Sequence, residues 1–316
     1  IARQDGDVIA RNTKKFNLNP HDAIVLAGVS EDIMMAKNGG AVIVAAGWCG
    51  DEQVAGLGVK VDTPEEFLEV TRLTNAWSGS WWFAGASQSY KVRALADLSS
   101  MYVNDDQAAF ARKLTETVKS GGVRLKALLT TTARSLQAEG ISGTSSLIWG
   151  VYPSSGSLND DTEVLSDFTH RLRTITSRVQ MAKRGIPLFI RHKKAIKRSG
   201  GRCVDRNDPR EQIETIHINP FYRGKIHGRN VIVIDDCVTY GLSFAVAASF
   251  LRKAGAASVT GVALGRFGRC LSYHPITILG DPFAPVKGSQ GYQSQQRLQL
   301  NGSFDAAAQA SLRELI

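Results

Sequence analysis

Residues 231–243 read Val-Ile-Val-Ile-Asp-Asp-Cys-Val-Thr-Tyr-Gly-Leu-Ser. Four β-branched residues predict a buried strand, and Asp235 and Asp236 place two carboxylates at its C-terminal end. Thr239, Gly241 and Ser243 then indicate a tight turn that leads into a helix. In an open α/β sheet, ligands bind at this edge, and N–H groups at a helix start can hold a phosphate.

The two aspartates narrow the kind of ligand. Carboxylates can accept hydrogen bonds from vicinal sugar hydroxyls or help to hold a divalent cation. A molecule that carries both a diol and a phosphate is a ribose 5-phosphate. The plainer interpretation is that Asp235 and Asp236 only end a strand before a solvated turn.

The rest of the chain shows the same alternation of strands and helices, which is typical of an α/β sheet. Further buried strands are predicted over 23–28, 41–47, 146–151, 187–190, 258–264 and 276–279. Helices are predicted over 31–39, from Thr63 onward, and over 162–183, 241–254 and 304–315. Residues 91–138 are predicted to be helical throughout, with a break at Gly121-Gly122.

These patterns predict an α/β protein with a Rossmann-like parallel sheet. We expect a partial α/β unit over 1–74, a helical linker or hood over 75–145, an α/β domain over 146–283, and an irregular tail over 284–316 that closes with a short helix.

Composition sets further limits. The 316 residues carry a net charge of +9, and the segment 183–230 alone holds thirteen basic and four acidic residues. Such a segment suits phosphate-rich small molecules or nucleic acid, or it is simply a solvated surface. No apolar run is long enough for a membrane span, so no membrane partner is expected. Four scattered cysteines without a CxxC motif favour a reducing, cytoplasmic location.

The segment 231–243 resembles the signature of type I phosphoribosyltransferases, and most closely that of the ComF-like subgroup. Four apolar residues, two acids and a Thr/Gly-rich loop follow one another in that signature. Thr239, Gly241 and Ser243 match it, whereas Tyr240 stands where a threonine is expected. The resemblance extends over about 146–270 and implies that the 146–283 segment is a phosphoribosyltransferase domain.

The resemblance implies a ligand and a set of site residues. The ligand is phosphoribosyl diphosphate, whose phosphoribose is transferred to a nitrogen acceptor that the sequence does not identify. Asp235 and Asp236 are the implied catalytic residues and hold Mg²⁺. The implied ligand-binding residues are Thr239, Tyr240, Gly241, Leu242 and Ser243 in the signature, Ser154, Ser155 and Gly156 in a pyrophosphate turn, and Arg191, Lys193, Lys194, Lys197 and Arg198 in a basic closing loop.

The N-terminal segment resembles the last part of a haloacid-dehalogenase-like (HAD) domain. Gly28-Val29-Ser30-Glu31-Asp32 follows that family's late acidic motif, with Val29 in place of its first acid. Asp5-Gly6-Asp7 has the spacing of the family's nucleophile, but no strand fits before it. The resemblance therefore implies a truncated or degenerate HAD-like unit over 1–74.

Three functions remain open at this point. The first is a phosphoribosyltransferase, and fusions of this kind resemble proteins of bacterial stress and phage-defence gene clusters. The second is a non-catalytic regulator that senses phosphoribosyl diphosphate or binds nucleic acid through 183–230. The third is a HAD-type phosphatase, which the missing nucleophile disfavours. A homo-oligomer or a protein partner is compatible with each.

Overall fold

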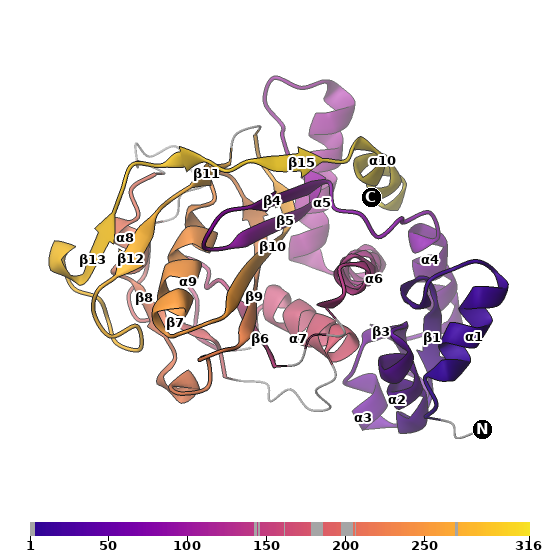
Figure 1. Cartoon of the computed structure of the whole chain (residues 1–316). Coiled ribbons are helices and arrows are strands. Elements are labelled where there is room, and N and C mark those ends of the chain that lie inside the picture. The colour runs from indigo at the N-terminus through magenta and orange to yellow at the C-terminus, as the bar shows by residue number, and fades with distance from the viewer. Residues whose placement is uncertain are drawn as a thin grey trace.

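A six-stranded, mostly parallel sheet forms the centre of the computed structural model (Figure 1). The structure describes residues 4–141, 144, 146–160, 162–177, 186–196, 205, 207–268 and 271–316. The strand order is β15-β4-β5-β10-β9-β6, in which β5, β10, β9 and β6 run parallel. The strands are β4 (Phe83–Ala86), β5 (Lys91–Asp97), β6 (Leu147–Val151), β9 (Asn230–Val238), β10 (Ser258–Arg266) and β15 (Gly302–Phe304). The predicted α/β class is thereby confirmed.

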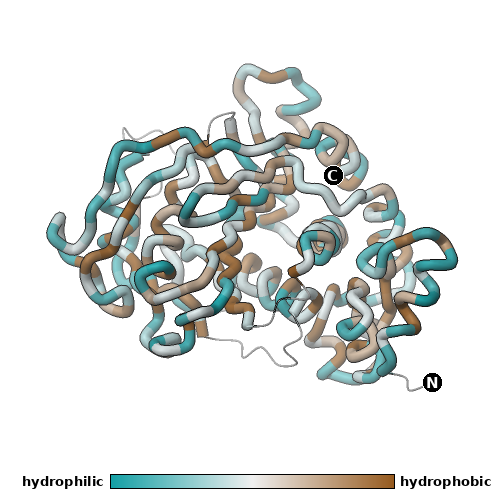
Figure 2. Tube along the Cα trace, in the orientation of Figure 1, coloured by the Kyte–Doolittle hydropathy of each residue, from teal (hydrophilic) through white to brown (hydrophobic). Residues whose placement is uncertain are grey.

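Strands β9 and β10 are built from segments that the sequence analysis predicted as buried strands. Val231, Ile232, Val233 and Ile234 are all buried, because β9 has a hydrogen-bonded neighbour on each side. Helix α9 (Leu242–Lys253) follows and packs on β9 and β10, and β12 (Ile276–Ile278) lies against it. Figure 2 shows hydrophobic residues gathered along the inner strands, with polar residues on the outer loops.

Residues 83–97 differ from the prediction. The expectation of helix from residue 91 is wrong, because Lys91–Asp97 forms β5 beside β10 in the main sheet. β4 and β5 make an antiparallel hairpin closed by a hydrogen bond from Ser87 N to Tyr90 O of 2.9 Å. The helices begin later, with α5 (Asp105–Ser120) and α6 (Val123–Ala138), and the predicted break at Gly121-Gly122 is confirmed.

The tail also differs from the prediction of irregular structure over 284–303. It contributes β13 (Tyr292–Ser294), which pairs with β12, and β14 (Leu298–Gln299), which pairs with β11 (Ser272–Tyr273). β15 then joins the main sheet beside β4 before α10 (Ala306–Leu315) closes the chain as predicted. The structure of the tail therefore comes from main-chain hydrogen bonds to other strands, which its composition alone does not indicate.

The N-terminal segment forms a separate three-stranded parallel sheet in the order β1-β2-β3. Its elements are α1 (Asp7–Lys15), the 3-10 turn Pro20–Asp22, β1 (Ile24–Ala27), α2 (Ser30–Gly39), β2 (Val42–Ala46), α3 (Glu52–Ala55), β3 (Val59–Val61) and α4 (Pro64–Thr74). The predicted Thr63 cap is present, since its hydroxyl accepts from Glu66 N at 3.2 Å. Glu66 in turn accepts from Asp62 N.

Helix α6 joins this small sheet to the rest of the molecule. Arg134 donates to Asp22 at 2.6 Å and to the Thr74 carbonyl at 2.8 Å. Lys126 contacts Glu66 at 2.7 Å. Because these partners lie on the 3-10 turn Pro20–Asp22 and on α4, the helix ties two separate segments of the N-terminal unit to the rest of the molecule.

The elements between β6 and β9 are α7 (Val164–Thr176), β7 (Phe189–Arg191), α8 (Arg210–Ile213), β8 (Ile216–Ile218) and the 3-10 turn Pro220–Tyr222; the 3-10 turn Ser289–Gly291 follows in the tail. Helix α7 ends at Thr176, where Ser177 adopts extended backbone angles, so the helix is shorter than the one predicted over 162–183; residues 178–183 lie outside the described residues. β7 pairs with β8 rather than with the main sheet. Among the described helices, none has the length and apolar character that crossing a membrane requires.

Gly261 on β10 tests the packing of α9 against the sheet. A Cβ there would lie 2.5 Å from the Phe244 ring, so Gly261→Ala must displace that side chain or the helix. We expect a loss of about 1–3 kcal/mol in the free energy of unfolding, measured by urea denaturation. Gly280→Ala is the control, because its Cβ meets nothing within 4 Å. Equal unfolding midpoints for the two variants would contradict the close packing.

Candidate functional site

The C-terminal ends of the parallel strands meet at one edge of the main sheet. Val151 at the end of β6 pairs with Ile234 on β9, and Ala263 on β10 pairs with Asp235. The Tyr152 amide donates to the Ile234 carbonyl at 2.9 Å. The loop after β6 therefore begins beside Asp235 and Asp236. Two of the predicted site segments, 235–243 and 154–156, are brought together by this register.

Asp235 and Asp236 lie within β9, which extends to Val238 rather than ending at residue 234 as predicted. Asp236 is exposed, whereas Asp235 is only partly so. Burial, reinforced by the neighbouring charge of Asp236, holds the pKa of Asp235 well above its usual range, and a hydrogen bond from Ser243 opposes this. Ser243 is thus placed against the first carboxylate from the opening turn of α9.

The turn after β9 leaves the start of α9 open. Gly241 adopts φ +84°, and a Cβ there would lie 2.8 Å from the Ser272 carbonyl, so glycine is required. No side chain among the described residues caps this helix. Its first N–H groups have no partner within the helix and can donate to an anion. Leu242 is buried, so only its backbone, and not its side chain, can contact a ligand as predicted.

Tyr240 departs from the resembled signature and is the most exposed residue of the turn, at 36%. Its carbonyl accepts from Ser272 N and lies 3.2 Å from the His274 ring. Thr239 is half-buried beside it. The Tyr240 ring is therefore held at the rim of the site by its backbone and reaches solvent.

The loop after β6 presents small residues at the same edge. Ser154 is exposed, and its hydroxyl donates to Glu163 at 3.2 Å. Ser155 is half-buried, and its carbonyl accepts from Ala195 N. Gly156 is exposed, with nothing within 4 Å of the position of a Cβ. The loop has room for a ligand above Gly156.

Arg191 has a different role from the predicted one. It is buried, and its guanidinium donates to the carbonyls of Ser154 at 2.5 Å and Pro153 at 2.9 Å and to the Thr215 hydroxyl at 2.7 Å. Its side chain is occupied by the loop itself and does not reach toward a ligand. Arg191 therefore fixes the shape of the loop, and the prediction of a closing cation is wrong for this residue.

The remaining cations of the predicted closing loop are exposed where they are described. Lys193 and Lys194 face solvent directly after β7. The hydrogen bond from Ala195 N to Ser155 O keeps this segment beside the 154–156 loop. Lys197 and Arg198 lie outside the described residues. The lysines thus remain candidates for contact with a diphosphate.

Sequence reasoning missed the side chain that holds β7 to the loop. Asn159, at φ +59°, donates to the Arg191 carbonyl at 2.9 Å and accepts from the Arg191 amide at 2.6 Å. The asparagine side chain thus bonds both main-chain groups of Arg191 in β7 and attaches this strand to the loop after β6. Only its turn-favouring residue type could have drawn attention to it.

The described basic residues of the segment 183–230 do not form one surface. Arg229 precedes β9 and therefore lies at the sheet edge opposite Asp235, about 20 Å away at about 3.3 Å per residue. Arg223 pairs with Asp281 at 2.6 Å, and Lys225 lies 3.2 Å from the centre of the Phe221 ring. Among the described residues, the cations of this segment therefore lie at both ends of β9 rather than at one.

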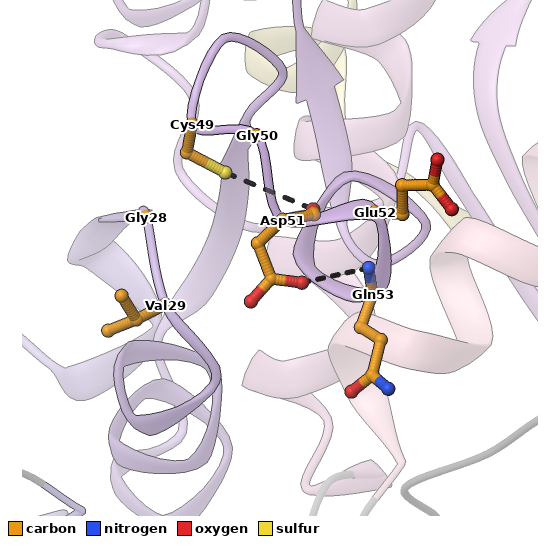
Figure 3. Close-up of a pocket in the computed structure, with 7 residues that line it drawn as sticks. All are labelled: Gly28, Val29, Cys49, Gly50, Asp51, Glu52 and Gln53. Atoms are coloured by element: carbon orange, nitrogen blue, oxygen red, sulfur yellow. Dashed lines mark hydrogen bonds between the residues drawn. The ribbon is translucent and has the colours of Figure 1, made fainter.

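A hollow of about 600 Å³ lies at the C-terminal edge of the small sheet (Figure 3). It is lined by Gly28, Val29, Cys49, Gly50, Asp51, Glu52 and Gln53. Asp51 caps α3 by accepting from Gln53 N, and Asp32 accepts from Gly28 N and Val29 N. Asp7 begins helix α1, so Asp5-Gly6-Asp7 does not end a strand.

Comparisons with models of known protein families, with curated proteins and with solved structures find no match to this chain. Within the described ranges, no group of three or more His, Cys, Asp or Glu side chains is placed to hold a metal ion. The C-terminal edge of the main sheet is therefore the feature of the molecule that indicates a function.

Two histidines contact each other beside the Arg191 clamp, the set of hydrogen bonds by which the Arg191 guanidinium holds the loop after β6. His192 Nδ1 lies 3.0 Å from His217 Nδ1, and His192 Nε2 lies 3.1 Å from the Glu214 carbonyl. A carbonyl only accepts, so His192 carries its proton on Nε2 and accepts from His217. Burial lowers the pKa of both rings, and the mutual charge lowers that of His217 further.

We therefore expect the free energy of unfolding to decrease as the pH is lowered. In the unfolded chain the histidines take up protons at about pH 6.5, whereas in the folded chain their pKa values are lower. The stabilisation that is present above about pH 6.5 is therefore lost as the pH falls through the pKa values of the folded state. Melting temperatures between about pH 8 and about pH 5 should fall less in His192→Gln/His217→Gln than in the wild type. His227→Gln, a change at an exposed histidine, should keep the wild-type slope. Parallel profiles for all three proteins would refute the explanation.

Proposed function

We propose that this chain binds phosphoribosyl diphosphate at the C-terminal edge of the main sheet and transfers its phosphoribose to a nitrogen acceptor. The observation that carries the proposal is the placement of Asp235 and Asp236 beside the uncapped start of α9. The small-residue loop 154–156 follows β6, which pairs directly with β9, and neighbouring strands lie about 4.8 Å apart. One sugar with a phosphate at one end and a diphosphate at the other can span these groups.

Each part of the site matches one part of that ligand. The carboxylates accept hydrogen bonds from the two ribose hydroxyls. The N–H groups at the start of α9 and the Thr239 hydroxyl donate to the 5-phosphate, joined by the Ser243 hydroxyl once it releases Asp235. The loop 154–156 receives the diphosphate, and Lys193 and Lys194 offset its charge from the adjoining segment.

The reaction requires positioning and charge stabilisation rather than a covalent nucleophile. Departure of diphosphate leaves positive charge on the sugar, which the nearby carboxylates stabilise. Cys237 is not suited to attack the sugar, because burial and the two aspartates hold the pKa of its thiol well above the usual range. The thiol therefore stays protonated and unreactive.

The resemblance also implies Mg²⁺, and the residues present fit it. Mg²⁺ prefers oxygen ligands and is commonly held by one or two carboxylates together with substrate phosphates. Asp235 and Asp236 would supply those carboxylates, with the phosphate oxygens of the ligand completing the coordination. When bound, the ion would neutralise charge on the diphosphate.

Calorimetric titration with phosphoribosyl diphosphate and Mg²⁺ tests the binding step. Asp235→Asn/Asp236→Asn should weaken binding by at least about 100-fold, since each charge-assisted hydrogen bond contributes about 1.5–3 kcal/mol. Asp105→Asn/Asp106→Asn is the matched control, because it removes an adjacent exposed pair at the start of α5. Equal affinities for the two double variants, or no binding by the wild type, would reject the proposal.

Turnover separates the transferase from a non-catalytic sensor of the same ligand. The Tyr240 ring at the rim, in place of a threonine, is the feature that favours a sensor. Pyrophosphate release would be followed while nucleobases and nucleotides are supplied in turn as acceptors. Release that depends on an acceptor supports the transferase, whereas tight binding without release under any acceptor supports the sensor.

A further inference from the structure

A small, partly open pocket lies between α7 and the strand that leads into the 154–156 loop. Its volume is about 60 Å³, and its walls include Trp149 on β6, Ser166 and Arg173 on α7, and Leu188 and Tyr222. A single water needs about 10–15 Å³ by this measure, so the cavity has room for one tetrahedral oxyanion or a few waters. Figure 1 shows α7 between the main sheet and the N-terminal unit.

Two residues that line this pocket each carry a hydrogen-bond donor that has no partner among the described residues. They are Arg173 Nε and Trp149 Nε1, and both atoms are shielded from solvent. Neither an arginine nor an indole nitrogen can accept a hydrogen bond. Leaving a buried donor unsatisfied costs about 1–3 kcal/mol, and more for a charged group. An acceptor bound in the pocket would satisfy both donors.

The local charge is positive. Lys37 on α2 is buried and lies near enough to Arg173 for the arginine to add to the burial that lowers the lysine pKa to about 8. Lys37 is therefore still mainly protonated at neutral pH. Of the described residues that line the cavity, none is Asp or Glu. Two neighbouring cations favour an anion over a cluster of neutral waters.

From these observations we infer that the cavity is a binding site for a small tetrahedral oxyanion of the inorganic phosphate type, held by Arg173 Nε and Trp149 Nε1. This site does not depend on the proposed transferase activity, because none of the residues proposed to contact phosphoribosyl diphosphate lines it. The structure connects the two places mechanically. One wall, Trp149–Val151, continues into the 152–156 loop, and the other, 186–188, continues into β7 and the Arg191 clamp.

A bound anion would brace both walls. The position of a Cβ on Gly150 would be 2.5 Å from Leu188, so the two walls already touch beside the cavity. Tyr222 donates to the Ile186 carbonyl at 3.0 Å and closes one side. Filling the cavity would link α7 to these walls through Arg173 and stabilise the loop that we assign to the diphosphate.

Thermal unfolding in increasing inorganic phosphate tests the site, with chloride at matched ionic strength as the reference. The wild-type melting temperature should rise with phosphate, because a ligand of the folded state alone stabilises it by mass action. Arg173→Gln should weaken the apparent phosphate affinity at least tenfold, and Trp149→Phe should weaken it while keeping the ring. Without phosphate, Arg173→Gln should melt no lower than the wild type, since it removes a partly buried cation whose Nε has no partner among the described residues.

Two controls keep the result separate from the strand edge. Arg171→Gln removes a cation of the same helix that pairs with Asp167, and it should keep the phosphate response. Thr239→Val/Ser243→Ala changes the proposed 5-phosphate contacts and should also keep it, while Arg173→Gln should keep binding of phosphoribosyl diphosphate. The inference is overturned if the wild type shows no phosphate response, if Arg173→Gln retains it, or if only Thr239→Val/Ser243→Ala loses it.

Discussion

The parallel pairing of β9 with β6 on one side and β10 on the other is the constraint on which the rest of this molecule depends. It buries the apolar half of β9 and carries Asp235 and Asp236 to the edge where β6 also ends. A shift of register by one residue would turn every side chain to the opposite face. The candidate site therefore exists only because the core packs in this register.

Arg191 adds a second constraint at the same edge. A buried guanidinium costs free energy unless its donors are satisfied, and here the loop carbonyls and Thr215 satisfy them. The loop after β6 is thereby shaped in advance of any ligand, with Asn159 holding the clamp to the chain. Arg173, one helix away, has the contrasting property of an unsatisfied donor, which is why it points to an occupant.

The elements predicted from the sequence are those whose local pattern and tertiary environment agree. The β9 strand, the α9 helix, the Thr63 cap and the break at Gly121-Gly122 all belong to this group. β5 was mistaken for helix because its alanines favour helices, although Val92, Ala94 and Ala96 alternate with Lys91 and Arg93 as in a strand. The tail strands carry no such alternation, since their pairing comes from β4, β11 and β12.

The sequence alone determined the α/β class and the chemistry of the strand edge, because β-branched runs, adjacent acids and a glycine turn act over a few residues. Only the tertiary structure decided which cations face solvent and which are structural. Arg191 and Lys193 look alike in the sequence, yet one is buried against carbonyls 37 and 38 positions away and the other is exposed. The reason is that burial and hydrogen-bond satisfaction depend on contacts between distant segments, which local residue patterns do not encode.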